Sequence, residues 1–170
     1  LMIDLVQVIP GKEYGVMHRQ NRSENEVVVV VKPWSDEKKP VLKEQYRKAI
    51  EDYIEPYRLI NTKVTVESAR YAGICVHGKI ALDQDSPKTR KAVLERISRE
   101  LSYTERKHPF GTVISYGQLF TALENTEGVK KVLELNLERT GNAARKNDRG
   151  DVLLEADALG ILEETDLEFC

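Results

Sequence analysis

The sequence has few of the features on which specialised small proteins depend. Its 170 residues contain only two cysteines, Cys75 and Cys170, which are too few for a disulfide framework or a zinc cluster. The longest apolar run covers residues 27–31, whereas a membrane-spanning helix needs about 20 residues. The first residues lack a basic segment followed by a long apolar core, so no secretory signal is visible. We therefore predict synthesis in a reducing cytoplasm and no membrane partner.

The motifs that identify common enzyme classes are also missing. The sequence has no G-x-S-x-G elbow, no G-x-x-x-x-G-K-[ST] loop and no G-x-G-x-x-G fingerprint. The histidines lie far apart, without a second ligand residue at a spacing typical of metal sites. They are His18, His77 and His108. Neighbouring acids such as Asp83 with Asp85, or Glu163 with Glu164, are typical of solvated surface. We predict a protein that is not an enzyme, with no catalytic, cofactor-binding or metal-binding residues and no cofactor.

Charge is nearly balanced overall but unevenly distributed. The 26 basic and 28 acidic residues leave a net charge of −2, which supplies no global field for nucleic acid. Residues 88–108 contain seven Lys or Arg and three acids, whereas residues 151–170 contain seven acids and no base. A nucleic-acid-binding helix would use Lys88, Arg90, Lys91, Arg96 and Arg99. Because Glu95 and Glu100 interrupt them and no aromatic platform is interleaved, nucleic-acid binding is not expected. A solvated face, or pairing with an acidic surface within or between subunits, is favoured instead.

Hydrophobic patterning predicts four strands and one helix in the first half. The five valines at 27–31 are β-branched, and the run is too short for a helix, which favours a central strand covered on both faces. Pro40 suits the first turn of a helix, after which apolar residues recur at helical spacing. The predicted elements are strands at 3–8 and 27–31, a helix at 40–54, and strands at 62–67 and 74–82.

The second half is predicted to contain two capped helices and further strands. Ser86 followed by Pro87 begins a helix, and Ser115 can cap a shorter one after the His-Pro-Phe-Gly turn at 108–111. Residues 141–151 are polar and bounded by glycine, which predicts an exposed hairpin loop. This loop contains the tripeptide Arg-Gly-Asp at 149–151, to which we assign no adhesive role. The other predicted elements are a helix at 87–101, strands at 129–138, 152–154 and 160–162, and a final alternation at 167–169.

This order of elements predicts an α+β fold of mixed and antiparallel sheets with helices packed on the sheet faces. A hydrophobic content of 41% is enough to build a core. The order also allows two small α/β subdomains. We place the first at residues 1–84 and the second at 85–170, with the exposed loop near 141–151 in the second.

Three segments resemble the C-terminal part of the Baseplate J-like family, the wedge proteins of contractile phage tails and related injection machines. The first reads VVVVVKP, then LKEQYRKAIEDYIEPYRLINTKVTVESA, and the second reads YAGICVHGKIALD. The third reads HPFGTVISYGQLFTALENTEGVKKVLELNL and is similar to the family's Pro-Phe-Gly turn, short helix and strand. Together they cover about residues 25–139, while the tail at 141–170 departs from the pattern. The segment LVQVIPGKEYGV resembles the junction where the family's upstream domain ends, which implies that the chain continues a longer protein.

The resemblance implies a structural, non-catalytic role as a baseplate component of a phage, prophage or phage-derived contractile injection system. Expected partners are other baseplate wedge and hub proteins, together with self-association into an oligomer, and the expected location is a virion or phage-tail-like particle. The family has no catalytic residues to carry over. The alternative is a small-molecule-binding or regulatory α+β module, which would require an apolar pocket with converging polar groups. An enzyme would need two or more desolvated acids or histidines in one cleft.

Overall fold

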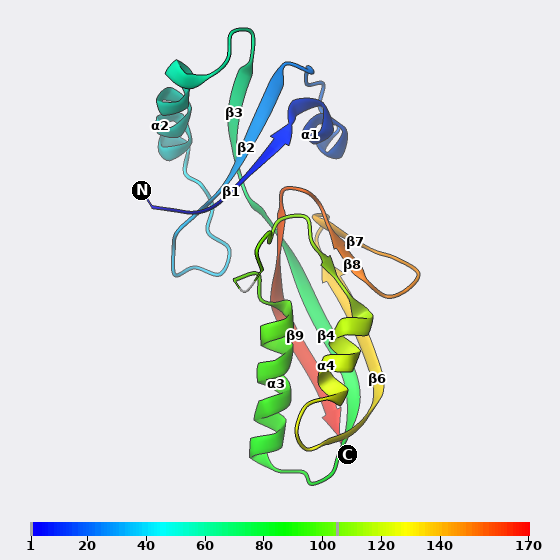
Figure 1. Cartoon of the computed structure of the whole chain (residues 1–170). Coiled ribbons are helices and arrows are strands. Elements are labelled where there is room, and N and C mark those ends of the chain that lie inside the picture. Colours follow the sequence, from blue (N-terminus) through cyan, green and yellow to red (C-terminus); the bar gives the residue numbers. More distant parts are fainter. Residues whose placement is uncertain (1, 105) are drawn as a thin grey trace. The chain divides into compact units, whose positions relative to one another are not determined.

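The computed structural model describes residues 2–104 and 106–170, and the chain divides into two compact units, Leu1–Arg70 and Tyr71–Cys170 (Figure 1). The predicted α+β class with mixed and antiparallel sheets is confirmed: helices pack on the faces of two three-stranded sheets, and a third, smaller sheet lies in the second unit. Each unit has its own apolar core.

The first unit is built on the sheet order β1-β2-β3. These strands are β1 (Ile3–Pro10), β2 (Glu26–Pro33) and β3 (Lys63–Ser68). The central strand β2 runs antiparallel to β1 and parallel to β3. Its side chains Val28, Val30 and Val31 are fully buried, from both faces of the sheet. The predicted central valine strand is therefore confirmed.

Helix α2 (Glu44–Ile54), followed by the short 3-10 turn η1 (Glu55–Tyr57), makes the crossover that a parallel β2–β3 pair requires. One side of α2 packs on the sheet through Tyr46, Ile50 and Ile54. The helix begins at Glu44 and not at Pro40 as predicted, because the backbone N–H of Leu42 donates to Ser68 Oγ at 3.0 Å. That bond holds the preceding segment extended against β3.

Helix α1 (Gly11–His18) was not predicted, since Gly11 and Gly15 are weak helix formers. Close packing explains both glycines. A Cβ at Gly11 would lie 2.6 Å from Glu26 Cβ, and one at Gly15 would lie 2.6 Å from the carbonyl oxygen of Gln20. Tertiary contact with the start of β2, and not local propensity, accounts for this helix.

The second unit is built on the sheet order β6-β4-β9. Its strands are β4 (Arg70–Leu82), β6 (Val129–Thr140) and β9 (Ala158–Phe169). Strand β6 runs antiparallel to β4, with register shifts beside Ile80 and Leu82. At the end of β9, the N–H of Cys170 donates to the carbonyl of Ile80 and its carbonyl accepts from the N–H of Leu82, at 3.1 and 2.8 Å. This is the pattern of parallel strands, so β9 runs parallel to β4.

Helices α3 (Pro87–Leu101) and α4 (Tyr116–Glu124) cover one face of this sheet (Figure 1). Both predicted caps are confirmed: Ser86 Oγ accepts from the N–H of Thr89 at 3.1 Å, and Ser115 Oγ accepts from the N–H of Gln118 at 3.3 Å. Buried side chains from both helices pack against alternate residues of β4. They are Val93, Ile97, Leu101, Leu119 and Leu123 from the helices, and Ala72, Ile74, Val76, Ile80 and Leu82 from β4.

The segment 141–151 contains structure that the sequence did not reveal. Strands β5 (Val113–Ile114), β8 (Val152–Leu154) and β7 (Ala144–Lys146) form a small antiparallel sheet in that order. Ala143 and Ala144 are 3% and 4% exposed. The prediction of an exposed hairpin loop over 141–151 is wrong for these residues, because small alanine side chains fit beneath neighbouring elements without the large apolar residues that signal burial.

The two units divide in the sequence at the start of β4, after Arg70, and not after residue 84. Only Ala69 separates Ser68, the end of β3, from Arg70, the start of β4. Both strands share one apolar alternation, which led us to predict a single subdomain over residues 1–84. Hydrogen bonding assigns β4 to the β6-β4-β9 sheet and thus to the second unit.

The Pro-Phe-Gly turn is part of the core of the second unit. Phe110 is 8% exposed, and Gly111 has a φ of +62°, a left-handed conformation that glycine adopts without strain. The N–H of Gly111 donates to the carbonyl of Ala158 at 3.2 Å, which joins the turn to β9. Phe120 on α4 is only partly buried against the same core.

We expect Phe110→Ala to destabilise the second unit by about 3 kcal/mol, since truncating a buried ring removes apolar contacts and leaves a cavity. Phe120→Ala should cost less because its ring is partly solvated already. Urea unfolding followed by circular dichroism would measure both. Equal unfolding midpoints for Phe110→Ala and the parent protein would contradict the assignment of this turn to the core.

Candidate functional site

Large apolar side chains are exposed mainly on the first unit. Among the described residues, 11 of the 14 strongly exposed large apolar side chains belong to the first unit, although it is the shorter of the two. Those in the first unit are Met2, Ile3, Val6, Val8, Val16, Trp34, Val41, Tyr53, Tyr57, Leu59 and Ile60. Apolar surface of this kind is typical of interaction sites. The first unit is therefore the better candidate for binding another molecule.

One group of these residues lies where α2 ends and the chain turns back to β3. We call Tyr53, Tyr57, Leu59 and Ile60 the apolar apex; their exposed fractions are 72%, 76%, 76% and 90%. The two tyrosine rings lie 5.8 Å apart. Asn61 has a φ of +66°, so the chain reverses immediately after Ile60 and leaves its side chain at the tip of the turn.

Hydrogen bonds hold the apolar apex in one shape. The N–H of Thr62 donates to the carbonyl of Leu59 at 3.0 Å, and the Arg58 guanidinium donates to the carbonyl of Thr62 at 3.1 Å. Arg58 also pairs with Glu55 at 2.7 Å. Tyrosine and arginine side chains are enriched at the centres of protein–protein interfaces, and a surface that is ordered before binding loses little conformational entropy in the complex.

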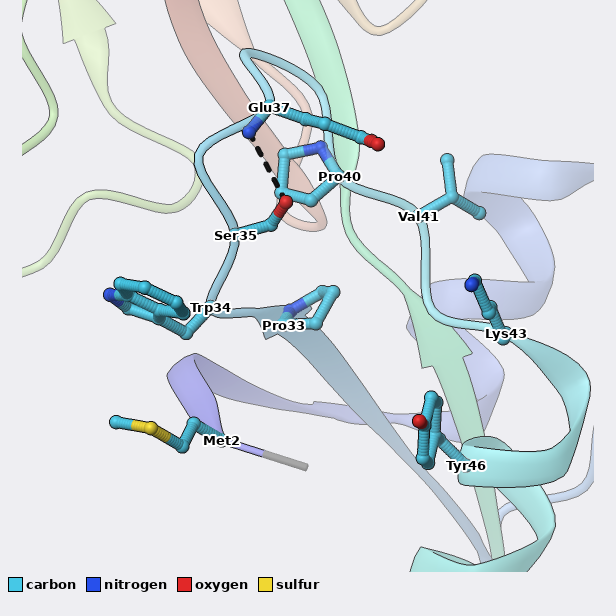
Figure 2. A pocket seen from close by; sticks show the side chains of 9 residues that line it. All are labelled: Met2, Pro33, Trp34, Ser35, Glu37, Pro40, Val41, Lys43 and Tyr46. Carbon is cyan, nitrogen blue, oxygen red and sulfur yellow. Dashed lines mark hydrogen bonds between the residues drawn. The ribbon is translucent and has the colours of Figure 1, made fainter.

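A pocket lies at the other end of α2. Figure 2 shows Trp34 and Met2 on one side of it, Val41, Lys43 and Tyr46 on the other, and Pro33 between them. Its volume is about 310 Å³, and Ser35, Glu37 and Pro40 complete the lining. Ser35 Oγ accepts the backbone N–H of Glu37 at 3.1 Å, which shapes the loop around it (Figure 2). We call this hollow the Trp34 pocket; its walls combine aromatic and aliphatic side chains with the polar side chains of Ser35, Glu37 and Lys43.

The uncovered face of the second sheet is polar. Lys79 on β4 pairs with Glu168 on β9 at 2.9 Å, and Lys146 pairs with Glu138 on β6 at 3.1 Å. The hydrogen bond and charge of Glu168 raise the pKa of Lys79, and hydrogen bonds from Asn136 and Lys146 lower the pKa of Glu138. The members of each pair stabilise one another's charged forms, and the two pairs join β4 to β9 and β6 to β7.

Cys75 and His77 lie on this polar face of β4. Burial, followed by the nearby charges of Glu164 and Glu163, raises the pKa of Cys75, so its thiol stays protonated and is a poor nucleophile. His77 Nδ1 lies 3.9 Å from an Asp166 carboxylate oxygen. The other two histidines lie elsewhere in the chain: His18 stacks on Tyr14 with ring centroids 4.2 Å apart, and His108 is exposed beside the Pro-Phe-Gly turn.

The neighbouring acids considered as paired carboxylates have separate partners. Asp85 accepts two hydrogen bonds from Arg90, at 2.7 and 2.6 Å, and these lower the pKa of Asp85. Glu163 accepts from Thr140 Oγ1 at 2.6 Å. Within residues 2–104 and 106–170, no group of three or more His, Cys, Asp or Glu side chains is arranged to hold a metal ion.

Most of the basic segment belongs to α3, and the ion pairs of this helix are local. Arg90 pairs with Asp85, Lys91 with Glu95 at 3.7 Å, and Arg96 with Glu100 at 3.2 Å. Lys88 and Arg99 belong to the same helix. Among the β9 acids, Glu168 pairs with Lys79 on β4 and Glu163 accepts from Thr140 on β6, while the Arg90 guanidinium lies over the Phe169 ring at 5.1 Å. Within residues 2–104 and 106–170, the ion pairs of α3 given above are thus local, and pairing of this helix with an acidic surface of another subunit stays a prediction.

The Arg-Gly-Asp tripeptide is part of a closed turn. Asn147 Oδ1 accepts from the backbone N–H groups of Arg149 and Asp151, both at 2.9 Å. The Asp151 carboxylate accepts from the Asn147 side chain at 3.0 Å and from the N–H of Tyr116 at 2.9 Å, at the start of α4. Both bonds lower the pKa of Asp151, and they use the carboxylate within the fold.

Comparison with known proteins identifies a similar fold. No family model matches the chain, and no curated protein matches it. Among solved structures, the chain resembles a chain in the cryo-EM structure of the anti-feeding prophage baseplate, determined with six-fold symmetry. Its fold is similar to part of a baseplate chain. The TM-score is 0.59 at 15% sequence identity, over 83% of this chain and 29% of the baseplate chain. This chain thus corresponds to less than a third of that protein's length.

None of the described helices is long and apolar enough to cross a membrane.

The surfaces of the first unit were not identified from sequence, because the pattern does not reveal which apolar side chains stay uncovered. Tyr53 follows the helical spacing of the apolar residues of α2, yet its side chain is 72% exposed. The one available signal was the density of Tyr, Leu and Ile just before a strand, in a segment where Pro56 ends the helix.

We expect Asp151→Asn to weaken the turn in a pH-dependent way. Folding lowers the pKa of the Asp151 carboxyl group. The ionised carboxylate therefore stabilises the fold fully at pH values above its pKa in the unfolded chain, which is about 3.9. This stabilisation is lost as the pH falls through the lower pKa of the folded protein. The difference in unfolding free energy between parent and Asp151→Asn should therefore shrink as the pH decreases from about 6 to about 3. Denaturant unfolding at several pH values measures it; a difference that does not change with pH would contradict the assignment.

Proposed function

We propose that this chain is a non-catalytic structural component of the baseplate of a contractile injection system. The observation that carries the proposal is the similarity of its fold, over 83% of the chain, to part of a chain in the anti-feeding prophage baseplate. The Baseplate J-like resemblance of residues 25–139 supports the same assignment independently of the coordinates. The finer proposal is a wedge protein that contacts neighbouring wedge and hub proteins.

The surface of the first unit supports an assembly role. The apolar apex is exposed yet held in place by backbone and Arg58 hydrogen bonds, so little conformational freedom is lost on binding. On the polar face of the second unit the charged side chains pair with one another, and burial raises the pKa of the Cys75 thiol, both of which support a structural role. In this proposal the chain is made in the bacterial cytoplasm and joins a phage-tail-like particle.

The first test is association with the products of neighbouring tail genes. Co-expression with candidate wedge and hub proteins, followed by affinity purification of this chain, should recover a complex of defined stoichiometry. Deleting the gene from a producing strain should leave tubes or sheaths without complete baseplates in electron micrographs. Normal particles after the deletion, or no partner from any tail gene, would refute the baseplate proposal.

The apolar apex should supply much of the binding energy to such a partner. Replacing both Leu59 and Ile60 by serine should weaken the complex at least about tenfold, because the serines remove most of the apolar surface that these two side chains would bury against a partner. The matched control is Val16→Ser, since Val16 is 77% exposed but lies on α1. Isothermal titration with each variant measures the affinity, and equal affinities would exclude the apex from the interface.

The Trp34 pocket favours a second candidate, the small-molecule-binding module. Its volume of about 310 Å³ lies at the lower end of the range of ligand sites. Trp34 is the only tryptophan in the chain, so its fluorescence reports directly on this pocket. A saturable fluorescence change with a metabolite, abolished by Tyr46→Ala, would support a binding module, whereas a change only with a tail protein would support assembly.

A further inference from the structure

Two sheet edges in this protein are closed by a carboxylate from a neighbouring helix. On β3, the outward N–H of Val66 donates to Glu51 Oε1 of α2 at 3.0 Å. On β6, the N–H of Val132 donates to Glu124 Oε1 of α4 at 3.4 Å. Such side chains occupy backbone groups that would otherwise pair with a strand from another molecule. Protection of edges is thus a feature of both units.

The remaining edge of the first sheet is β1, and it is open between residues 5 and 9. Val6 and Val8 are 50% and 59% exposed. Val31 and Val29, the β2 residues opposite Val6 and Val8, contact α2. This helix packs mainly over β3, so it leaves Val6 and Val8 partly uncovered. In the part of the chain that the structure describes, no side chain forms a hydrogen bond with the outer backbone of residues 5–9. A strand edge with exposed valines and no protecting charge is suited to pairing with another strand.

The sequence of this edge is nearly symmetric about its centre. Residues 5–9 read Leu-Val-Gln-Val-Ile and contain no charge. In an antiparallel pair of two such strands centred on Gln7, Leu5 faces Ile9, Val6 faces Val8, and Gln7 faces Gln7 of the second copy. Opposite residues in antiparallel strands share a face, so like side chains meet on both sides of the pair.

The backbone geometry is compatible with the same pairing. Residues that face one another have numbers that add to 14, so an odd residue always meets an odd one and an even residue an even one. Backbone groups that point outward alternate along a strand, so outward groups of one copy meet outward groups of the other. Pro10 has no N–H and ends the ladder at one side, while the register shift between Ile3 and Leu5 ends it at the other.

We propose that β1 is a self-association strand, which pairs antiparallel with β1 of a second copy of this chain around a two-fold axis at Gln7. The product is a six-stranded sheet made from two β1-β2-β3 sheets, with Val6 and Val8 of both copies in one apolar patch. A two-fold axis requires a self-complementary surface, and residues 5–9 supply one. A strand from a different protein would need no symmetry about Gln7, so the near-palindrome favours a second copy.

This inference does not depend on the baseplate proposal, since it uses only the edge and its sequence. A dimer that is weakened by lysines at positions 6 and 8, in a chain without tail-protein partners, would support β1 pairing and refute the baseplate role. A monomer that still binds tail proteins would do the reverse.

Charge design at two half-exposed positions tests the pairing. The variant Val6→Lys/Val8→Lys places lysines opposite lysines across the two-fold axis, whereas Val6→Lys/Val8→Glu places each new lysine opposite a new glutamate. Sedimentation analysis should show that the parent chain is a dimer. The dissociation constant of the dimer should rise at least about tenfold in Val6→Lys/Val8→Lys, because like charges face one another. In Val6→Lys/Val8→Glu it should stay within about threefold of the parent value. Circular dichroism melting should show that both variants remain folded.

Cross-linking tests the register. In a Cys170→Ser background, Gln7→Cys should form an intermolecular disulfide under mild oxidation, because directly opposite Cα atoms lie about 4.5–5.5 Å apart, within disulfide reach. The control Val16→Cys is exposed but lies outside the strand, and it should remain mostly monomeric.

Three outcomes would overturn the proposal. One is a parent protein that stays monomeric at high concentration. Another is equal dissociation constants for the two charge variants, and the third is cross-linking of Gln7→Cys no faster than Val16→Cys. A chain that is monomeric alone but pairs through β1 with a different protein would also overturn it, in favour of a heterologous strand.

Discussion

Backbone hydrogen bonding of the two central strands, β2 and β4, is the constraint on which the rest of the structure depends. Each has a strand on both sides, and a buried backbone group without a partner is costly. The burial of Val28, Val30 and Ile74 follows from these positions. Helices then cover the sheet faces, and the remaining question for each sheet is how its edges are satisfied.

The edges divide the molecule into protected and available surface. Glu51 and Glu124 each place a carboxylate on an outward N–H, so these helices both cover a face and close an edge. Ion pairs such as Lys79–Glu168 cover the polar face of the second sheet. The first unit instead exposes apolar surface, at the apolar apex, in the Trp34 pocket and along the outer edge of β1. The first unit therefore carries most of the surface suited to binding another molecule, and the fold of the chain is similar to part of a baseplate chain.

Sequence patterns predicted the helices and strands that form because of residues close to them in the chain. The caps at Ser86 and Ser115 begin helices where expected, because each serine side chain bonds a backbone N–H three residues later. The valine run forms a central strand because β-branched residues suit a sheet buried on both faces. Helix α1 was missed for the complementary reason: Gly11 and Gly15 disfavour a helix locally, and close packing against other segments requires them.

The sequence by itself determined the type and place of most helices and strands, the absence of common catalytic motifs, and the near-symmetry of residues 5–9. Only the tertiary structure decided that β4 leaves the sheet of β3, that Asp151 is used within a turn, and that Tyr53 stays exposed. The physical reason is that periodicity and capping act over a few residues. Sheet membership, edge protection and exposure instead depend on groups such as Glu51 and Val66, which are brought together from separate parts of the chain.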